Sequence, residues 1–440
     1  MTQTPLPAAA VPRRIPRDQH PISRKQISPN ALRVLYRLRD AGHDACLVGG
    51  AVRDLLVGRQ PKDFDVATDA TPEQVRALFR NCRLVGRRFR LAHVIFGPEI
   101  IEVATYRAHS AAGEDGDGRV VENGRILRDN VYGSIEEDAV RRDFTCNALY
   151  YSIDDFSVRD FVGGFEDCRD RVLRLIGDPE TRYREDPVRM LRAVRLAAKL
   201  GFAIDPASEA PIPRLGGLLA EASSARLFDE AQKLFLTGHA LASLHGLQRL
   251  GLLAHLMPEL DAALAADASG LCQQMIDRAM RNTDQRVAEG RPVTPAFLFA
   301  ALLWPVYAAG VQDLLAKGHP LAVAEQRAAD RVLLGQCPRI AIPRRFSVPM
   351  EEIWFMQSRL HVRQRKRVLR LLAHPRFRAA FDFLELRASV TPELAPELAF
   401  WQALQGPDRD AVLEQAQQQG RAQPAGRSRR RRRRAKAGEG

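Results

Sequence analysis

Two aspartates separated by one phenylalanine, in the segment KDFDVAT, have the type and spacing of a metal site. On a strand, Asp63 and Asp65 share one face while Phe64 points into the core. Neighbouring carboxylates repel each other, and a divalent cation between them removes that repulsion; their hard oxygens favour Mg2+. Two such ions roughly 3.5 to 4 Å apart activate a hydroxyl and stabilise a leaving pyrophosphate. We therefore predict that Asp63 and Asp65 are catalytic and bind two Mg2+ ions.

A glycine pair and an arginine precede the aspartates in LVGGAVRDLL. Gly49 and Gly50 allow close approach of a ligand to the backbone, and a helix beginning at Ala51 directs its free amides toward an anion. Arg53 in the first turn can pair with phosphate oxygens. The alternative is an ordinary strand, turn and helix facing solvent. The combined spacing favours a phosphate site next to the metals.

A small mixed sheet is expected to position these residues. Its predicted strands cover residues 45–50, 62–68, 82–86, 91–97 and 99–107, and its predicted helices cover 28–43, 51–58 and 71–80. The glycine-rich, acidic segment 108–130 is expected to be a mobile loop. The fold class is therefore α+β, and this sheet region forms the head of the chain.

The remainder of the chain shows helical apolar spacing. Residues 184–202 are predicted to form one amphipathic helix, and residues 205–415 are almost entirely helical in pattern. We divide the chain into a basic, disordered segment 1–25, a head 26–165, a helical neck 166–245, a helical body 246–415 and a disordered, Arg-rich tail 416–440. The apolar run 293–311 carries Pro295 and Pro305, and we interpret it as a buried core helix rather than a membrane span.

The basic charge of the chain is concentrated at its two ends. The formal net charge is +13, and residues 421–440 alone carry eight Arg and one Lys against one Glu. Such ends suit a polyanion such as nucleic acid, although a solubilising tail has the same composition. The six cysteines form no C-x-x-C pair, so no zinc site or disulfide framework is indicated, and the start of the chain lacks the apolar core of a signal peptide. We expect a cytoplasmic protein.

LVGGAVRDLL followed by DFDVAT resembles the head of the class II nucleotidyltransferases, the superfamily of bacterial poly(A) polymerases and tRNA CCA-adding enzymes. RRDFTCNAL at 141–149 and EDPVRMLRAVRLAAKL at 185–200 resemble two further signatures of that superfamily. By position, Asp63 and Asp65 match its metal-binding carboxylates. Arg141, Arg142 and Asp143 match the element that handles the sugar and phosphates of the nucleotide, and Asp143 is implied to be an essential acid.

Two points about these acids remain open. An ion pair with a neighbouring arginine is the alternative for Asp143. Glu102 is either a further acid near the metals or an exposed strand residue.

Asp186 and Arg189 lie three residues apart, so on one helix they share a face. An acceptor and a donor side by side can hydrogen-bond one base edge, which is the use that the resemblance implies; an ordinary salt bridge is the alternative. Arg192 continues the same face toward phosphate. We count Asp186, Arg189 and Arg192 with Gly49, Gly50, Arg53, Arg141 and Arg142 as nucleotide-binding.

The segment 81–97, with GRRFRLAHV at its centre, resembles the poly(A) polymerase branch. Four arginines, Arg83, Arg87, Arg88 and Arg90, suit RNA or triphosphate; a solvated basic edge strand is the alternative. The resemblance implies attack of an RNA 3′-hydroxyl on ATP. From the core-helix interpretation of residues 293–311, we expect no membrane partner. A CCA-adding enzyme and a non-catalytic RNA-binding protein are the alternative functions.

Overall fold

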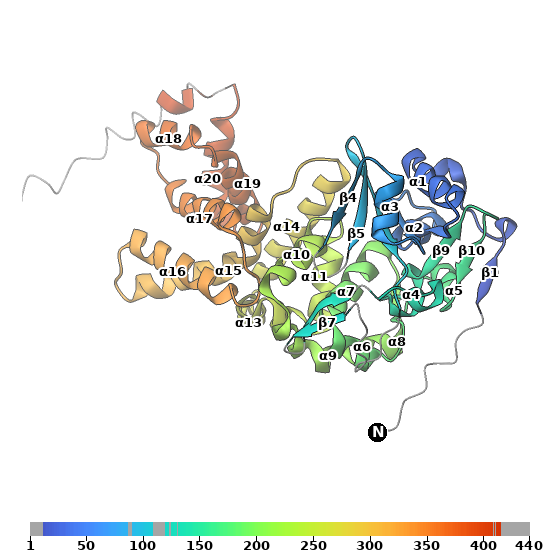
Figure 1. The fold of residues 1–440 in the computed structure, drawn as a ribbon. Helices are drawn as coiled ribbons and strands as arrows, with labels where there is room; N and C mark the ends of the chain where they lie inside the picture. The colour runs from blue at the N-terminus through green and yellow to red at the C-terminus, as the bar shows by residue number, and fades with distance from the viewer. Residues whose placement is uncertain are drawn as a thin grey trace, which may run out of the picture. The chain divides into compact units, whose positions relative to one another are not determined.

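The computed structural model describes residues 12–86, 90–108, 119–122, 125–129, 131–407, 409 and 411–414. The chain divides into two compact units, Met1–Leu218 and Leu219–Gly440. The first unit contains a mixed sheet with its helices, and the second unit is helical (Figure 1). The predicted α+β class is confirmed. Arg87, Arg88 and the Arg-rich segment 416–440 lie outside the described residues.

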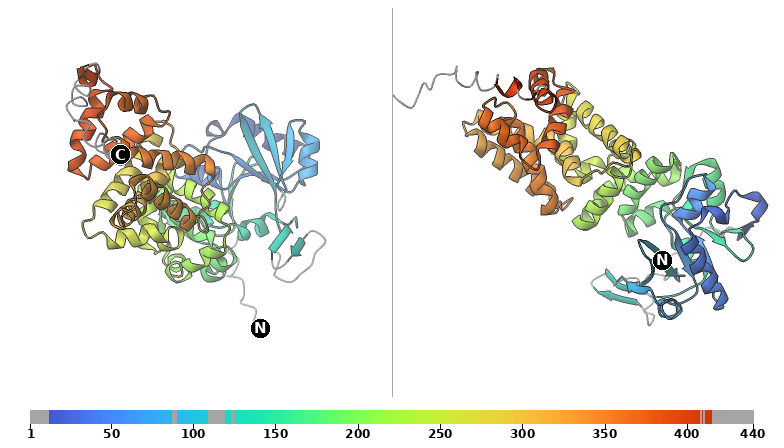
Figure 2. Two further views of the ribbon diagram at one scale, coloured as in Figure 1. Left: turned by 90° about the vertical axis from the view of Figure 1, so that its left-hand side faces the viewer. Right: turned by 90° about the horizontal axis from the view of Figure 1, so that it is seen from above.

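An eight-stranded sheet forms the centre of the first unit, in the order β1-β10-β9-β2-β3-β6-β5-β4. Only β3 and β6 pair in parallel; the other neighbours are antiparallel. Figure 2 shows β4, β5 and β6 in light blue. The strands are β1 (Arg13–Ile15), β2 (Ala45–Val48), β3 (Asp65–Thr68), β4 (Cys82–Val85), β5 (Leu91–Phe96), β6 (Glu99–Thr105), β9 (Leu149–Ser152) and β10 (Val158–Asp160).

Helices cover both faces of this sheet. On one face, α1 contacts β2, β3 and β6, because its buried stripe of Val34, Leu35 and Leu38 faces the strands. On the other face, Ala139 of α4 packs with Val48 and other buried residues. The helices of this unit are α1 (Pro29–Asp40), α2 (Gly50–Leu56), α3 (Pro72–Leu78), α4 (Ile135–Arg141), α5 (Gly164–Asp170), α6 (Pro179–Glu185), α7 (Val188–Leu200), α8 (Pro206–Glu209) and α9 (Ile212–Leu215), with the 3-10 turns η1 (Arg17–Gln19), η2 (Arg24–Gln26) and η3 (Thr145–Asn147).

The expected disorder of residues 1–25 is wrong for the part that the structure describes. β1 pairs with β10 at the edge of the sheet, and Ile15 and Ile22 are fully buried. The Pro-rich, basic composition hid these two apolar anchors, whose burial offsets the cost of ordering the segment. Residues 1–11 lie outside the described residues.

The expected loop 108–130 also contains regular structure. β7 (Arg119–Glu122) and β8 (Arg125–Asp129) pair as a separate two-stranded sheet. A third small sheet joins β11 (Val172–Leu173) to β12 (Ala203–Ile204) in parallel.

The single amphipathic helix predicted over 184–202 is two helices, because α6 ends at Glu185 and α7 begins at Val188. Pro187 cannot donate a backbone hydrogen bond, and it disfavours helical geometry in the preceding residue. Asp186 accordingly has extended dihedrals, φ −149° and ψ 92°. Asp186 and Arg189 therefore do not lie on one helix.

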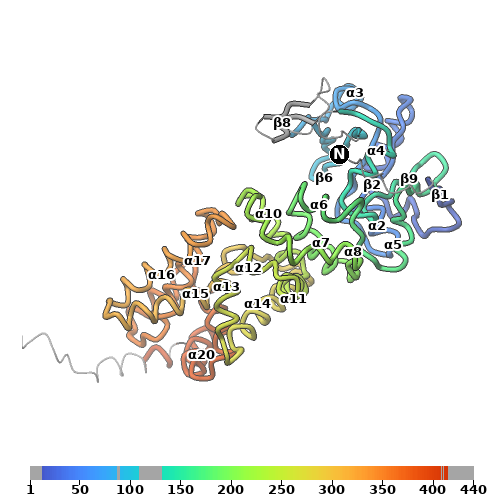
Figure 3. The backbone as a smooth tube through the Cα atoms, turned by 90° about the horizontal axis from the view of Figure 1, so that it is seen from below, coloured from blue at the N-terminus to red at the C-terminus, as the bar shows by residue number. Residues whose placement is uncertain are grey.

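The second unit is built from helices, among which α15, α16 and α17 pack side by side (Figure 3). The helices are α10 (Ser224–Phe235), α11 (Ala240–Arg249), α12 (Leu253–Leu256), α13 (Pro258–Ala266), α14 (Leu271–Ala288), α15 (Pro295–Ala316), α16 (Leu321–Gln336), α17 (Arg344–Arg359), α18 (Arg365–Leu372), α19 (Phe377–Ala388) and α20 (Ala395–Ala403), with η5 (Pro392–Leu394); η4 (Gly216–Glu221) spans the boundary between the units.

By length and composition, α15 is the one helix among the described residues that could cross a membrane, and half of its most apolar window is buried. It continues through Pro305 for 22 residues. Eleven of its residues are nevertheless buried, including Phe299 and Leu303. The burial of these residues, and not the length of the helix, supports the interpretation of α15 as a core helix.

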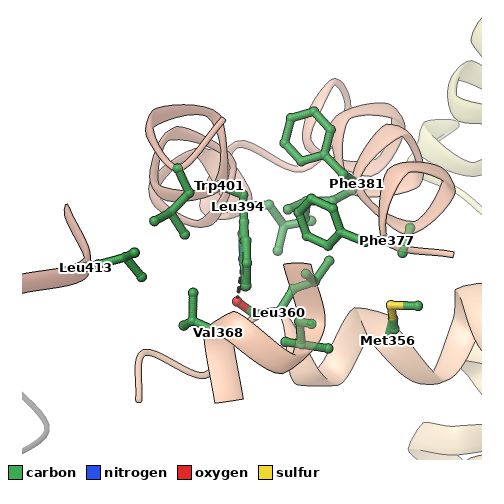
Figure 4. Close-up of a cluster of buried hydrophobic side chains, with 12 residues drawn as sticks. Met356, Leu360, Val368, Phe377, Phe381, Leu394, Trp401 and Leu413 are labelled. Atoms are coloured by element: carbon green, nitrogen blue, oxygen red, sulfur yellow. Dashed lines mark hydrogen bonds between the residues drawn. The ribbon is translucent and has the colours of Figure 1, made fainter. Parts of the chain in front are cut away.

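An apolar cluster organises the C-terminal helices of the second unit (Figure 4). Trp401 of α20 is fully buried among Val368, Phe377 and Phe381, and its indole nitrogen donates a 2.8 Å hydrogen bond to the Leu360 carbonyl oxygen. A buried tryptophan needs such a partner for its N–H. The cluster therefore joins α17, α18, α19 and α20 into one core.

Candidate functional site

Three acids, Asp63, Asp65 and Glu102, lie where β3 and β6 run side by side, and we call them the acidic row. Asp65 pairs in register with Glu102, and Glu102 pairs with His93 on β5, so the three side chains share one face. The His93 Nε2 atom lies 3.4 Å from a Glu102 carboxylate oxygen. Asp63 precedes the strand, but the pattern of exposed Asp63, buried Phe64 and exposed Asp65 is the predicted one.

The environment of Asp65 raises its pKa from 3.8 to about 6. Although the side chain is exposed, its surroundings remove part of its hydration, and this loss of solvent is the main cause. Glu102 and Asp63 add like-charge repulsion, whereas Arg142 acts in the opposite direction. An acid held in this way gains from a cation beside it.

The donor atoms of Asp63, Asp65 and Glu102 are all carboxylate oxygens, which suit Mg2+. Among the residues that the structure describes, no three His, Cys, Asp or Glu side chains converge closely enough to hold a metal ion by themselves. Mg2+ usually retains waters and substrate phosphate oxygens as ligands. The acidic row therefore fits an open site that phosphate completes.

The turn between β2 and α2 is formed by the glycine pair. Gly49 has φ 75°, a left-handed conformation that favours glycine, and a Cβ atom there would lie 3.5 Å from Arg142 Nη1. α2 begins at Gly50, one residue before the predicted start. The turn thus places backbone directly against the Arg142 guanidinium.

Arg53 is 3% exposed and already has protein partners. Its Nε and Nη2 atoms donate to Asp54 Oδ1 at 2.9 and 2.6 Å, and its Nη1 atom donates to Asn147 Oδ1. The Lys199 ammonium of α7 lies 3.5 Å from the other Asp54 oxygen. Arg53 is therefore anchored beneath the glycine turn rather than projecting freely from it.

Arg142 lies between the glycine turn and the acids. Its Nε atom donates to the Tyr150 hydroxyl at 3.0 Å, and its Nη2 atom donates to Asp138 Oδ2 at 3.0 Å. Burial opposes its charge, but Tyr150 and Asp138 outweigh that effect and raise its pKa. Arg141, its neighbour, instead donates to the Ala108 carbonyl oxygen.

Asp143 is held by groups from three residues. Its Oδ2 atom accepts hydrogen bonds of 2.9 and 2.5 Å from Arg192 of α7, and its Oδ1 atom accepts from the Phe144 amide at 2.8 Å and from Asn147 Nδ2 at 3.0 Å. Burial would raise its pKa, but Arg192 and Asn147 reverse the effect and hold the pKa at about 2. Asp143 therefore forms the ion pair with an arginine that was the alternative to a catalytic role. The arginine of this pair, Arg192, is itself a predicted nucleotide-binding residue.

Arg189 and Asp186 do not pair in this structure. Arg189 Nη1 donates to Glu185 Oε2 at 3.0 Å and to the Arg182 carbonyl oxygen at 2.7 Å, while Asp186 Oδ1 accepts from the Val188 amide at 3.2 Å. Arg189 thus forms a salt bridge with Glu185 instead of Asp186, and this pair joins the end of α6 to the first turn of α7.

The basic segment ahead of β5 is only partly described. Arg90 pairs with Glu73 at 2.5 Å, and Arg83 lies opposite His93 across β4 and β5. Arg83 thereby extends the register row that contains Glu102. This placement fits both interpretations of the segment: binding of RNA or triphosphate, and a solvated basic edge strand.

The structure joins Arg53, Asp143 and Arg192 through Asn147 and places Arg142 beside Gly49 and Asp65. Sequence analysis missed Asn147 and left Glu102 undecided. RRDFTCNAL contains Asn147, but no local pattern shows that its amide reaches back to Arg53. Glu102 needed the parallel register of β3 and β6, which joins residues far apart in the chain.

Three family profiles match this chain. Poly A polymerase head domain matches residues 45–174, the probable RNA and SrmB-binding site of polymerase A matches 201–264, and polymerase A arginine-rich C-terminus matches 317–436. The first match contains Gly49, Asp63, Asp65, Glu102 and Asp143.

Among curated proteins, poly(A) polymerase I of Salmonella typhi is 50% identical over 431 residues, covering 96% of this chain and 92% of that protein. Poly(A) polymerase I of Haemophilus influenzae is 45% identical and covers 91% of this chain and 90% of its own length. The CCA-adding enzyme of Geobacillus stearothermophilus is 40% identical over 227 residues, 51% of this chain and 54% of that protein.

Solved structures share the fold at low sequence identity. A tRNA-processing enzyme in apo form has a TM-score of 0.57 at 22% identity, covering 88% of this chain and 99% of its own. A tRNA nucleotidyltransferase complexed with a primer tRNA and an incoming ATP analog has a TM-score of 0.55, also at 22% identity, covering 84% of this chain and 97% of its own.

Proposed function

Because the chain belongs to the poly(A) polymerase family, we propose that it transfers AMP from ATP to RNA 3′-hydroxyl groups without a template and releases pyrophosphate. The observation that carries this proposal is the 50% identity to poly(A) polymerase I over 96% of the chain. The CCA-adding relative matches only 51% of the chain. Polyadenylation of RNA is therefore favoured over CCA addition.

We assign the metal-dependent part of the reaction to the acidic row. Enzymes of this family are generally metal-dependent. Asp63 and Asp65, with Glu102 beside them, would hold two Mg2+ ions, which would supply charge neutralisation for the hydroxyl and for the pyrophosphate. The raised pKa of Asp65 supports this assignment, because a bound cation would compensate for the lost hydration of the carboxylate and for the repulsion from Glu102 and Asp63.

We assign the nucleotide to the glycine turn and to the residues around it. Gly49 and Gly50 would admit the triphosphate, with Arg53, Arg141 and Arg142 as its cations and Asp143 accepting from the ribose. Asp186 and Arg189 would read the base after Arg189 leaves Glu185, while Arg192 keeps Asp143 ionised. Positioning and charge compensation would then contribute most of the rate.

The other regions are assigned by composition and family. We propose that the head 26–165, the neck 166–245 and the body 246–415 act in that order on nucleotide, base and RNA, and that the basic ends retain RNA by charge. The match at 201–264 to a probable RNA-binding site supports an RNA-binding role. The enzyme would act in the cytoplasm on RNA 3′ ends, in mRNA processing and RNA turnover.

The test uses the full chain, a short generic RNA, Mg2+ and each nucleoside triphosphate in turn, with products resolved by size. Long ladders with ATP alone are expected, and Asp63→Ala should abolish them. Asp170→Ala, which changes an exposed aspartate bound to Arg169, serves as the matched control. A short C-containing addition restricted to tRNA would identify a CCA-adding enzyme, and RNA binding without extension would identify a non-catalytic binding protein.

A further inference from the structure

Asn147 connects two predicted site residues that lie far apart in the chain: Arg53, predicted to bind the nucleotide, and Asp143, predicted to be an essential acid. Its Oδ1 atom accepts from Arg53 Nη1, and its Nδ2 atom donates to Asp143 Oδ1 at 3.0 Å. The residue is 9% exposed, so water competes little for either contact. Each end of the amide therefore has a dedicated partner.

The chemistry of the two partners determines the orientation of this amide. A guanidinium can only donate and an ionised carboxylate can only accept, so the Asn147 oxygen must face Arg53 and its nitrogen must face Asp143. The reversed orientation would oppose like groups on both sides. An aspartate here could serve Arg53 but would repel Asp143.

The backbone that carries Asn147 is also fixed. The Thr145 amide donates to the Arg174 carbonyl oxygen at 3.0 Å, and the Thr145 hydroxyl donates to Asp167 at 2.6 Å. A Cβ atom added to Gly164 would lie 2.1 Å from the Thr145 carbonyl oxygen, so α5 is pressed against η3. The hydrogen bonds of Thr145 and the packing of α5 on η3 therefore fix the backbone next to Asn147 and restrict movement of its side chain.

We infer that Asn147 is a positioning residue that couples the phosphate-side cation Arg53 to the sugar-side acid Asp143. This inference rests on the proposed function, in which both partners contact the nucleotide. Asn147 itself touches neither ATP nor metal; it sets the distance between the two groups that do. Loss of the amide should let each partner act independently.

Energetic coupling between the partners is the direct test. Arg53→Lys, Asp143→Asn and the double variant are made with Asn147 present and again with Asn147→Ala, and ATP affinity is measured by titration calorimetry on the full chain. With Asn147, the double variant should differ from the product of the single effects by at least about twofold, as coupled neighbours do. With Asn147→Ala, the two effects should multiply independently.

Asn147→Asp provides a nearly isosteric second background. It keeps the acceptor for Arg53 and removes the donor to Asp143, so it should weaken ATP binding and uncouple the pair. Asn30→Asp is the matched control, because Asn30 Nδ2 also donates to a carboxylate, Glu99 Oε2 at 2.6 Å, on the face of the sheet covered by α1. It should leave ATP affinity unchanged.

Unfolding temperatures of all variants separate folding from positioning. If Asn147→Ala is unfolded at the assay temperature, the coupling is measured in the Asn147→Asp background. Coupling that persists without the Asn147 amide, or unchanged ATP affinity in Asn147→Asp, would overturn the inference. RNA extension by the wild-type chain is measured separately and tests the proposed function. If the chain binds ATP and extends RNA but Arg53 and Asp143 are not coupled, only the role of Asn147 is refuted.

Discussion

Asp65 and Asp143 belong to the same unit, yet their surroundings move their pKa values in opposite directions, to about 6 and to about 2. Asp65 lies at an exposed position of the sheet, where partial loss of hydration and repulsion from Glu102 and Asp63 raise its pKa. Asp143 is largely enclosed, and Arg192 and Asn147 each bind one of its two oxygens. The contrast shows how surroundings set the behaviour of one residue type: Arg192 stabilises the charge of Asp143, whereas the environment of Asp65 disfavours its charge.

The largest expected effect comes from the exposed acid. Asp65→Asn should reduce RNA extension by about three orders of magnitude, because a metal-binding charge contributes several kcal/mol to the transition state. The unfolding temperature should not fall, since the substitution also removes repulsion from Glu102 and Asp63. Primer extension and thermal unfolding measure the two effects. Extension above a tenth of the wild-type rate would contradict the assignment.

Substitutions around Asp143 should act through stability. Arg192→Ala leaves Asp143 without its cation and should lower the free energy of unfolding by about 2 kcal/mol, a value moderated by the partial exposure of Arg192. Urea unfolding measures this. Arg184→Ala breaks an exposed pair with Glu180 and should cost less than about 0.5 kcal/mol. Equal costs for the two variants would show that Asp143 does not depend on Arg192.

The two acids should also give opposite dependences of stability on pH. Between pH 4 and 6 the folded chain binds more protons at Asp65 than the unfolded chain, so this contribution to stability decreases as pH rises. At Asp143 the depressed pKa stabilises the fold above pH 4, and this contribution is lost as pH falls toward 2.

Unfolding free energies of the wild type, Asp65→Asn and Asp143→Asn across this range give the two contributions by difference. We expect about 2 kcal/mol for Asp143 and less than about 1 kcal/mol for exposed Asp65 after allowance for solvent screening. Contributions of the same sign at both acids would contradict the comparison.

Local patterns in the sequence predicted much of this region. The alternation around Phe64 and the glycine turn at Gly49 each depend on neighbouring residues, and each appears in the structure. The break at Pro187 was also visible locally and was overlooked. Proline in this position outweighs helical periodicity, which is why Asp186 and Arg189 separate.

Contacts between distant segments could not be predicted in the same way. Glu102 lies beside Asp65 only because β3 and β6 pair in parallel, and β1 joins the sheet through three residues whose pairing depends on β10. Asn147 reaches Arg53 across 94 positions of the chain. Periodicity carries no information on such registers, so the acidic row and the Asn147 contacts required the fold.

The most direct test of the central claim is metal rescue at the two acids. Asp65→Cys should lose RNA extension with Mg2+ alone and regain part of it when the softer ion Cd2+ is added, because a thiolate prefers softer metals. Asp143→Cys should gain nothing from Cd2+, since its neighbours are Arg192 and Asn147. Rescue at Asp143, or none at Asp65, would contradict the assignment of metal binding to the acidic row.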